Sequence, residues 1–134
     1  MKIERFEEIE GWKLARELTR MVDSATKQLE FSKDFGLKDQ IQRAAGSAMH
    51  NMAEGFDGGS DAEFARFLRY AQRSCTEVKS QLYAALDQEY ISDDEFNLYL
   101  RPGNKNAPTH WWIHPILRKR GFVVPGAWSF VLCD

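Results

Sequence analysis

Apolar and polar positions alternate with a helical period over most of the first hundred residues. The clearest stripe recurs at spacings of three and four residues and consists of Phe64, Leu68, Ala71, Cys75, Val78, Leu82 and Ala85. Such a stripe is typical of a helix that packs at a shallow angle against other helices. Ser60 followed by Glu63 is a capping box, so we expect this helix to span 61–88.

Two earlier segments have the same period. The first predicts a helix over 8–30 whose apolar face consists of Trp12, Ala15, Leu18, Val22, Ala25 and Leu29. The second predicts a helix over 37–55 with the stripe Ile41, Ala45, Ala48 and Met52. Gly55 is expected to end it in the left-handed conformation that stops many helices.

A short fourth helix is predicted over 93–100, after a second capping box formed by Ser92 and Glu95. Pro102 disfavours helix at the residue before it. Long helices with short connections favour an all-α fold, an antiparallel up-down four-helix bundle. We therefore expect a bundle domain over 1–100 and an atypical Pro/Trp-rich C-terminal tail over 101–134, which holds all four prolines.

Composition and charge narrow the class of protein. The chain is 43% hydrophobic and 28% charged, which is typical of one globular domain. Residues 1–100 have 13 basic and 19 acidic side chains, hence −6, whereas the tail has five and one, hence +4. The overall net charge of −2 argues against a protein that coats DNA. No apolar signal core or membrane-length run is present, so we expect a soluble cytoplasmic protein.

A set of linked motifs narrows the possible protein family further than the helical periodicity does. GLKDQIQRAAGS (36–47) and NMAEG (51–55) closely resemble the family of 23S rRNA intervening-sequence proteins. Further matches at the family's spacing are Phe6, Trp12, Ala15, Glu63, Phe64, Phe67, Leu68, Ala71, Ser74 and Glu77. The resemblance covers residue 6 to about residue 100. Arg73 departs from it, because the family usually has glycine there.

The resemblance implies the architecture of the protein and the kind of partner that it binds, but it implies no particular reaction. Family members are four-helix bundles that assemble into rings, commonly pentamers, and their genes often lie within insertions in 23S rRNA genes. A related branch comprises the accessory proteins of diversity-generating retroelements, which pair with a reverse transcriptase and bind nucleic acid. For this chain the resemblance implies a homo-oligomer, a pentamer by analogy, with RNA or a nucleic-acid enzyme as a further partner.

Seven polar side chains form a candidate site on the second and third helices. They lie at helical spacings and are Gln40, Arg43, Ser47, Asn51, Glu54, Ser74 and Glu77. Two interpretations are open, an interhelical hydrogen-bond network or a binding site built around Glu54. We favour the network, because buried polar groups need partners and no nucleophile–base–orienter set accompanies these residues. We therefore predict no enzymatic activity and no catalytic residue.

Metal and cofactor sites are not predicted either. His50 and Glu54 are four residues apart, as are His110 and His114, but a stable zinc site needs three or four ligands. Cys75 lies at a core position and is interpreted as a small buried apolar side chain, and Cys133 as inert.

Two rows of basic side chains are candidate contacts for nucleic-acid phosphates. The first row is Lys13, Arg16, Arg20 and Lys27, and the second is Arg66, Arg69 and Arg73. The alternative, which we favour, is a solvated surface with ion pairs such as Lys13–Glu17, Glu17–Arg20 and Asp23–Lys27. In the tail, a basic cluster and nearby tryptophans suit either stacking of single-stranded nucleic acid or an apolar flap on the bundle: Arg118, Lys119, Arg120, Trp111, Trp112 and Trp128.

The sequence thus predicts a non-enzymatic oligomer that is a scaffold or an RNA-associated binding protein. The alternatives are a purely structural homo-oligomer without nucleic-acid affinity and an accessory subunit of a reverse transcriptase. The short fourth helix supports oligomerisation independently, because it leaves apolar bundle surface uncovered. Tail residues folding back over that surface are the competing explanation.

Overall fold

The computed structural model describes residues 3–100, and within them the chain forms helices and connections but no strand. Three helices are long, namely α1 (Glu10–Thr26), α3 (Phe35–Asp57) and α4 (Asp61–Asp87). Three elements are short, namely the 3-10 turn η1 (Phe6–Glu8), α2 (Leu29–Lys33) and α5 (Asp93–Leu100). The prediction of an all-α fold is confirmed.

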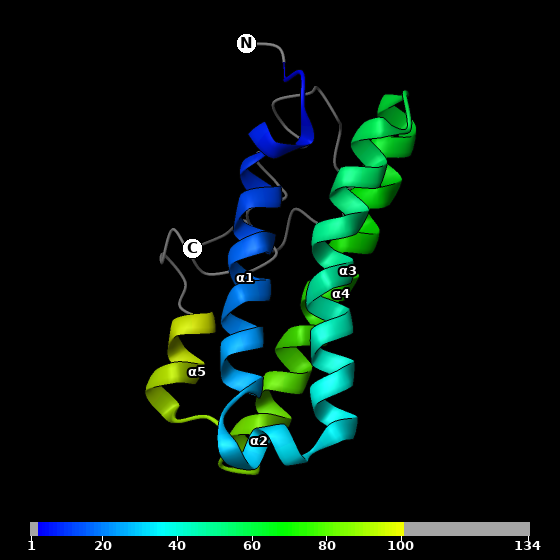
Figure 1. Ribbon diagram of the computed structural model, residues 1–134. Helices are drawn as coiled ribbons and strands as arrows, with labels where there is room; N and C mark the ends of the chain where they lie inside the picture. The colour runs from blue at the N-terminus through cyan, green and yellow to red at the C-terminus, as the bar shows by residue number, and fades with distance from the viewer. Residues whose placement is uncertain (1–2, 101–134) are drawn as a thin grey trace, which may run out of the picture.

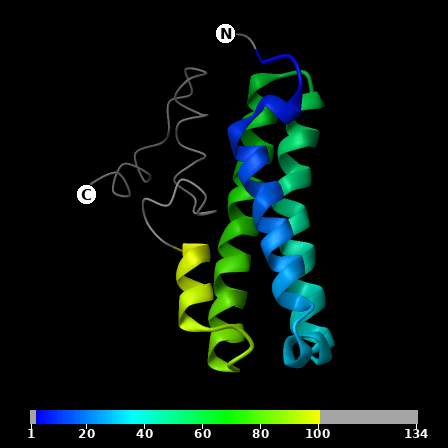
Figure 2. The same ribbon diagram turned by 60° about the vertical axis from the view of Figure 1, so that its left-hand side comes forward.

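The long helices lie side by side, with α3 next to both α1 and α4 (Figures 1 and 2). α1 and α4 run in one direction along the molecule, and α3 and α5 run in the opposite one (Figure 1). α5 contacts α1 through Tyr99, whose hydroxyl donates to the Met21 carbonyl at 3.0 Å. It contacts α4 through the rings of Phe96 and Tyr83, whose centroids lie 4.7 Å apart. Because α5 has only eight residues, no described helix occupies the fourth position beside the N-terminal halves of α1 and α4.

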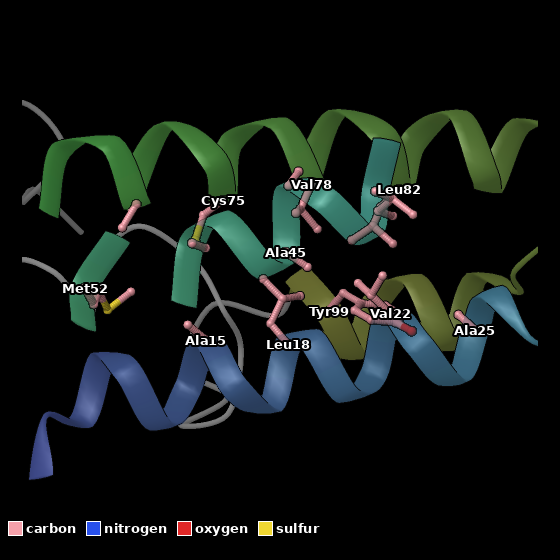
Figure 3. Close-up of a cluster of buried hydrophobic side chains, with 14 of the residues drawn as sticks. Ala15, Leu18, Val22, Ala25, Ala45, Met52, Cys75, Val78, Leu82 and Tyr99 are labelled. Atoms are coloured by element: carbon pink, nitrogen blue, oxygen red, sulfur yellow. The ribbon is translucent and has the colours of Figure 1, made fainter. Parts of the chain in front are cut away.

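The predicted apolar stripes meet in one core, shown in Figure 3 with side chains from α1, α3, α4 and α5. All seven stripe residues of α4 are buried, and so are the four predicted for α3. Cys75 is 5% exposed, and burial raises the pKa of its thiol to about 12. The thiol is therefore protonated at neutral pH, and the interpretation of Cys75 as a core side chain is confirmed.

Both predicted capping boxes begin helices where expected. The Ser60 hydroxyl accepts from the Glu63 amide at 3.2 Å, and α4 begins at the next residue. At α5 the box is reciprocal, since the Glu95 amide donates to Ser92 Oγ and the Ser92 amide donates to the Glu95 carboxylate. These contacts satisfy amides that no helical carbonyl can reach.

The single helix predicted over 8–30 is wrong, because the chain breaks after α1. Gln28 has extended backbone (φ −62°, ψ 144°), and α2 then starts at Leu29. The Thr26 hydroxyl donates to the Asp23 carbonyl and accepts from the Gln42 amide group, which fixes the end of α1 against α3. As a consequence Leu29, predicted on the apolar face, is 71% exposed.

The ends of α3 also differ from the prediction. The Asp34 carboxylate accepts from the Leu37 amide at 3.1 Å, so the helix begins at Phe35 rather than residue 37. Gly55 is not a left-handed stop, because α3 continues to Asp57 and the positive φ, 81°, belongs to Gly59.

Gly55 instead permits the close approach of α4. A Cβ at this position would lie 2.5 Å from the Cβ of Phe67 and 3.3 Å from the ring of Phe64. Gly46 lies on the same helix, but a Cβ there would meet only the His50 ring, at 3.7 Å. The two glycines therefore have different roles in the same helix.

We predict that Gly55→Ala and Gly46→Ala change stability in opposite directions. Gly55→Ala should lower the free energy of unfolding by about 1–3 kcal/mol, because the added methyl group forces α3 and α4 apart. Gly46→Ala should raise it by up to about 1 kcal/mol, because alanine favours helix and the space is open. Urea denaturation measures both, and equal effects of the two substitutions would contradict this account.

A second prediction concerns Tyr99 at alkaline pH. Burial raises the pKa of its phenol from 10.0 to about 12, and the nearby Glu95 charge adds to the shift. A raised pKa means that the fold favours the protonated phenol, so this stabilisation is complete below pH 10 and is lost as pH rises through about 12. Tyr99→Phe should lower the free energy of unfolding by about 1 kcal/mol at neutral pH and flatten its decline above pH 10.

Tyr70→Phe is the matched control, because Tyr70 is 40% exposed. Urea denaturation of both variants at neutral and alkaline pH measures the difference. A loss of stability in the control equal to that in Tyr99→Phe would count against a specific role of the Tyr99 hydroxyl.

Candidate functional site

Ser47 is the centre of the predicted polar set on α3 and α4. The Ser74 hydroxyl of α4 donates to Ser47 Oγ at 3.1 Å and so joins the two helices. The Asn51 amide group donates to the same Oγ at 3.0 Å and to the Ser47 carbonyl at 2.8 Å. Three of the seven predicted residues are thus brought together by direct hydrogen bonds.

The other four residues are not joined to this centre. Arg43 forms an exposed ion pair with Asp39 at 2.8 Å on the same helix. Glu77 accepts from Gln81 on α4 at 3.2 Å. Gln40 and Glu54 are exposed, and neither side chain makes a hydrogen bond with the part of the chain that the structure describes.

Gln81 is a polar core residue that the sequence analysis missed. It is 8% exposed, and its Oε1 has no hydrogen-bond partner among residues 3–100. Its position, four residues after Glu77 and seven after Ser74, continues the polar side of α4, and this spacing could have revealed it.

The outward side of α3 has a shallow, open hollow of about 650 Å³ around Gly46. Its lining consists of Asp39, Gln42, Arg43, Gly46, Ser47, His50, Asn51 and Glu54. Ser47 has no described base beside it, since its hydroxyl contacts are Ser74 and Asn51. No group of three metal-ligating side chains occurs among the described residues, so His50 and Glu54 gain no third ligand there.

The basic row of α1 is largely compensated by neighbouring groups. Lys13 pairs with Glu10 at 2.6 Å, rather than with Glu17 as predicted. Arg20 pairs with Glu17 at 3.8 Å, which confirms that pair. The Arg16 guanidinium lies 5.7 Å from the centre of the Trp12 ring.

Asp23 and Lys27 were also predicted to pair, and no ion pair joins them in the structure. Lys27 is the one member of the α1 row without a charged or aromatic partner in the described part of the chain.

The basic row of α4 is less compensated. Arg66 pairs with Glu63 at 3.4 Å and also lies over the Phe67 ring. Arg69 and Arg73 are exposed, and neither forms an ion pair with an acidic side chain of residues 3–100. Spacings of three and four residues place the three arginines on one side of α4, away from the core stripe. Each row thus has two cations without an acidic partner among residues 3–100, but only Arg69 and Arg73 lie four residues apart on one helix.

The remaining candidates of the sequence analysis lie outside the described residues. These are Cys133, the pair His110 and His114, and the tail cluster with its tryptophans. Among the residues that are described, no helix is both long enough and apolar enough to cross a membrane.

Comparison with known proteins places these features in a family. No curated protein matches the sequence. The family model described as 23S rRNA-intervening sequence protein matches residues 7–104. This match covers all helices of the structure from α1 to α5, together with the hydrogen-bonded centre at Ser47 and both basic rows. The chain belongs to the 23S rRNA-intervening sequence protein family.

Proposed function

We propose that this protein is a non-enzymatic scaffold that assembles with copies of itself and binds RNA through the arginine row of α4. The observation that carries the RNA-binding part is the pair Arg69 and Arg73, two exposed cations without an acidic partner among the described residues. Such cations gain most from phosphate contacts, because they give up no existing ion pair when they bind.

Assembly strengthens this interface. Two free arginines on one chain bind RNA weakly, whereas several copies in one assembly present the same row repeatedly to one RNA strand. The α1 row contributes less, because its two cations without an acidic partner, Arg16 and Lys27, are eleven residues apart and Arg16 lies against the Trp12 ring. The name of the family, which refers to 23S rRNA, supports RNA as the nucleic acid.

The architecture that we propose for the chain is an antiparallel four-helix bundle with α5 as its fourth member. In support, α5 runs opposite to α4 and is attached to both α1 and α4 through Tyr99 and Phe96. In this proposal a second copy of the chain completes the fourth position beside the N-terminal halves of α1 and α4.

A purely structural homo-oligomer is the second candidate function. It is favoured by the excess of acidic over basic residues in 1–100, 19 against 13, which repels RNA at long range. The first candidate predicts RNA binding that depends on salt and on the α4 row, whereas the second predicts no RNA binding.

We predict that the double variant Arg69→Gln/Arg73→Gln weakens RNA binding and its salt dependence. The slope of log K against log salt should become less negative by about 1.4 for single-stranded RNA, at about 0.7 for each lost phosphate contact. Fluorescence anisotropy with a labelled 23S rRNA fragment, over a range of salt concentrations, measures the slope.

Lys13→Gln/Arg20→Gln is the matched control. It also removes two positive charges, but these charges are paired with Glu10 and Glu17 in the wild type. The control should change the slope by much less than the α4 variant. Equal slopes for the two variants would reject the α4 interface, and absence of binding by the wild type would leave the structural homo-oligomer.

A further inference from the structure

Tyr70 lies at the seam between α3 and α4, next to the arginine row of α4. Phe67 lies against α3 where Gly55 lets the two helices approach, and Ser74 donates to Ser47 of α3. Tyr70 is three residues after Phe67 and four before Ser74, so the three residues lie on the same side of α4. Because α3 and α4 run in opposite directions, Tyr70 is level with the part of α3 between Ser47 and Gly55 (Figure 1).

The Tyr70 ring is exposed and is supported by a second ring. Its centroid lies 5.7 Å from that of Phe67, with an angle of 73° between the two ring planes. The Arg66 guanidinium lies 5.5 Å from the centre of the Phe67 ring. Tyr70 nevertheless keeps 40% of its surface exposed. An aromatic ring that is packed on one side and open on another offers a flat surface on which a further ring can stack at a low entropy cost.

The surface beside Tyr70 is positive on the outward side of α4. Residues 64–76 include three arginines and no acidic side chain. Arg66 and Arg73 lie four residues before Tyr70 and three after it, so they flank the ring on the same side of the helix. Arg69 and Arg73 have no acidic partner among residues 3–100, whereas Arg66 has one. Anionic groups are therefore attracted to the immediate surroundings of the ring.

The α3 side of the seam has a different character. The hollow of α3 reaches the seam at Ser47 and Asn51, and its lining also includes Glu54. Glu54 is exposed and forms no ion pair with the described residues. A carboxylate repels phosphate, but it accepts hydrogen bonds from the amino groups of nucleobases. Phosphates therefore fit the outward arginines, whereas a base fits Tyr70 and the side of the seam that faces α3.

This separation of ring and cations fits a nucleotide whose base is unpaired. In an RNA duplex the bases are paired and stacked inside the helix, so a protein surface meets mainly phosphates and 2′-hydroxyls. In a single strand a base can turn outward and stack on an aromatic side chain while the neighbouring phosphates contact cations. A duplex would use the arginines but would leave the Tyr70 ring without a contact.

We propose that the arginine row of α4 binds single-stranded RNA, with an unpaired base stacked on Tyr70 and the neighbouring phosphates on Arg69 and Arg73. The proposal rests on the RNA binding proposed above, and it names the class of RNA and the residue that selects it. It requires only one chain, because the ring and both cations lie on α4.

Substitution of Tyr70 in the full-length protein tests the stacking. The probes are a labelled RNA strand without self-complementarity and the same strand annealed to its complement, and fluorescence anisotropy measures the binding of each. The wild type should bind the single strand more tightly than the duplex. Tyr70→Leu should weaken binding of the single strand about fivefold or more, the loss typical of one stacked base. It should leave binding of the duplex unchanged.

Tyr70→Phe and Phe35→Ser are the matched controls. The first keeps the aromatic face and should bind the single strand as tightly as the wild type does. The second removes a ring that is 75% exposed at the start of α3, at the other end of the bundle from the arginine row, and should not change binding (Figure 1). Tyr70→Leu should also leave the slope of log K against log salt unchanged, because it removes no charge.

The remaining outcomes overturn the proposal in different ways. No binding of either probe by the wild type would reject RNA binding and this inference with it. Binding that is weakened by Arg69→Gln/Arg73→Gln but not by Tyr70→Leu would reject the stacking and keep the phosphate contacts. Equal or tighter binding of the duplex by the wild type would reject the choice of single-stranded RNA. A loss by Tyr70→Leu that is the same for both probes would mean that the substitution disturbs the arginine row, and it would also reject the stacking.

Discussion

The close packing of α3 against α4 is the constraint on which the rest of the structure depends. These two helices share the most extensive contact in the described residues, and Gly55 allows the backbone of α3 to reach the Cβ of Phe67. The approach also brings the hydroxyls of Ser47 and Ser74 to 3.1 Å. α1 and α5 then cover the remaining apolar side of this pair, so their positions follow from it (Figure 3).

Much of the fold could be predicted from the sequence, because its signals are local and repeated. The stripe of α4 fixes one buried side over many turns, and Ser60 and Ser92 mark helix starts through contacts with residues only three positions away. The errors arise where a distant contact decides the outcome. Gly55 resembles a helix stop in sequence, but its role depends on Phe67, and the break after Thr26 depends on Gln42.

The candidate site was less predictable for the same reason. Periodicity correctly placed Ser47, Asn51 and Ser74 on facing helices, but it gave Gln40 and Glu54 equal weight although both are exposed. Similarly, the two basic rows look alike in sequence, and only the side-chain contacts show which cations are paired with Glu10, Glu17 and Glu63 and which have no acidic partner in the described residues.

The break between α1 and α3 closes one end of the core. It buries Phe31, whose ring stacks on Tyr90 at 5.2 Å, and Tyr90 in turn donates to the Asp34 carboxylate that caps α3. This bond and the negative charge of Asp34 raise the pKa of Tyr90, because both favour the protonated phenol. The same cap makes Phe35 the first, exposed residue of α3. One local rearrangement therefore seals the end of the core and presents an aromatic ring to solvent.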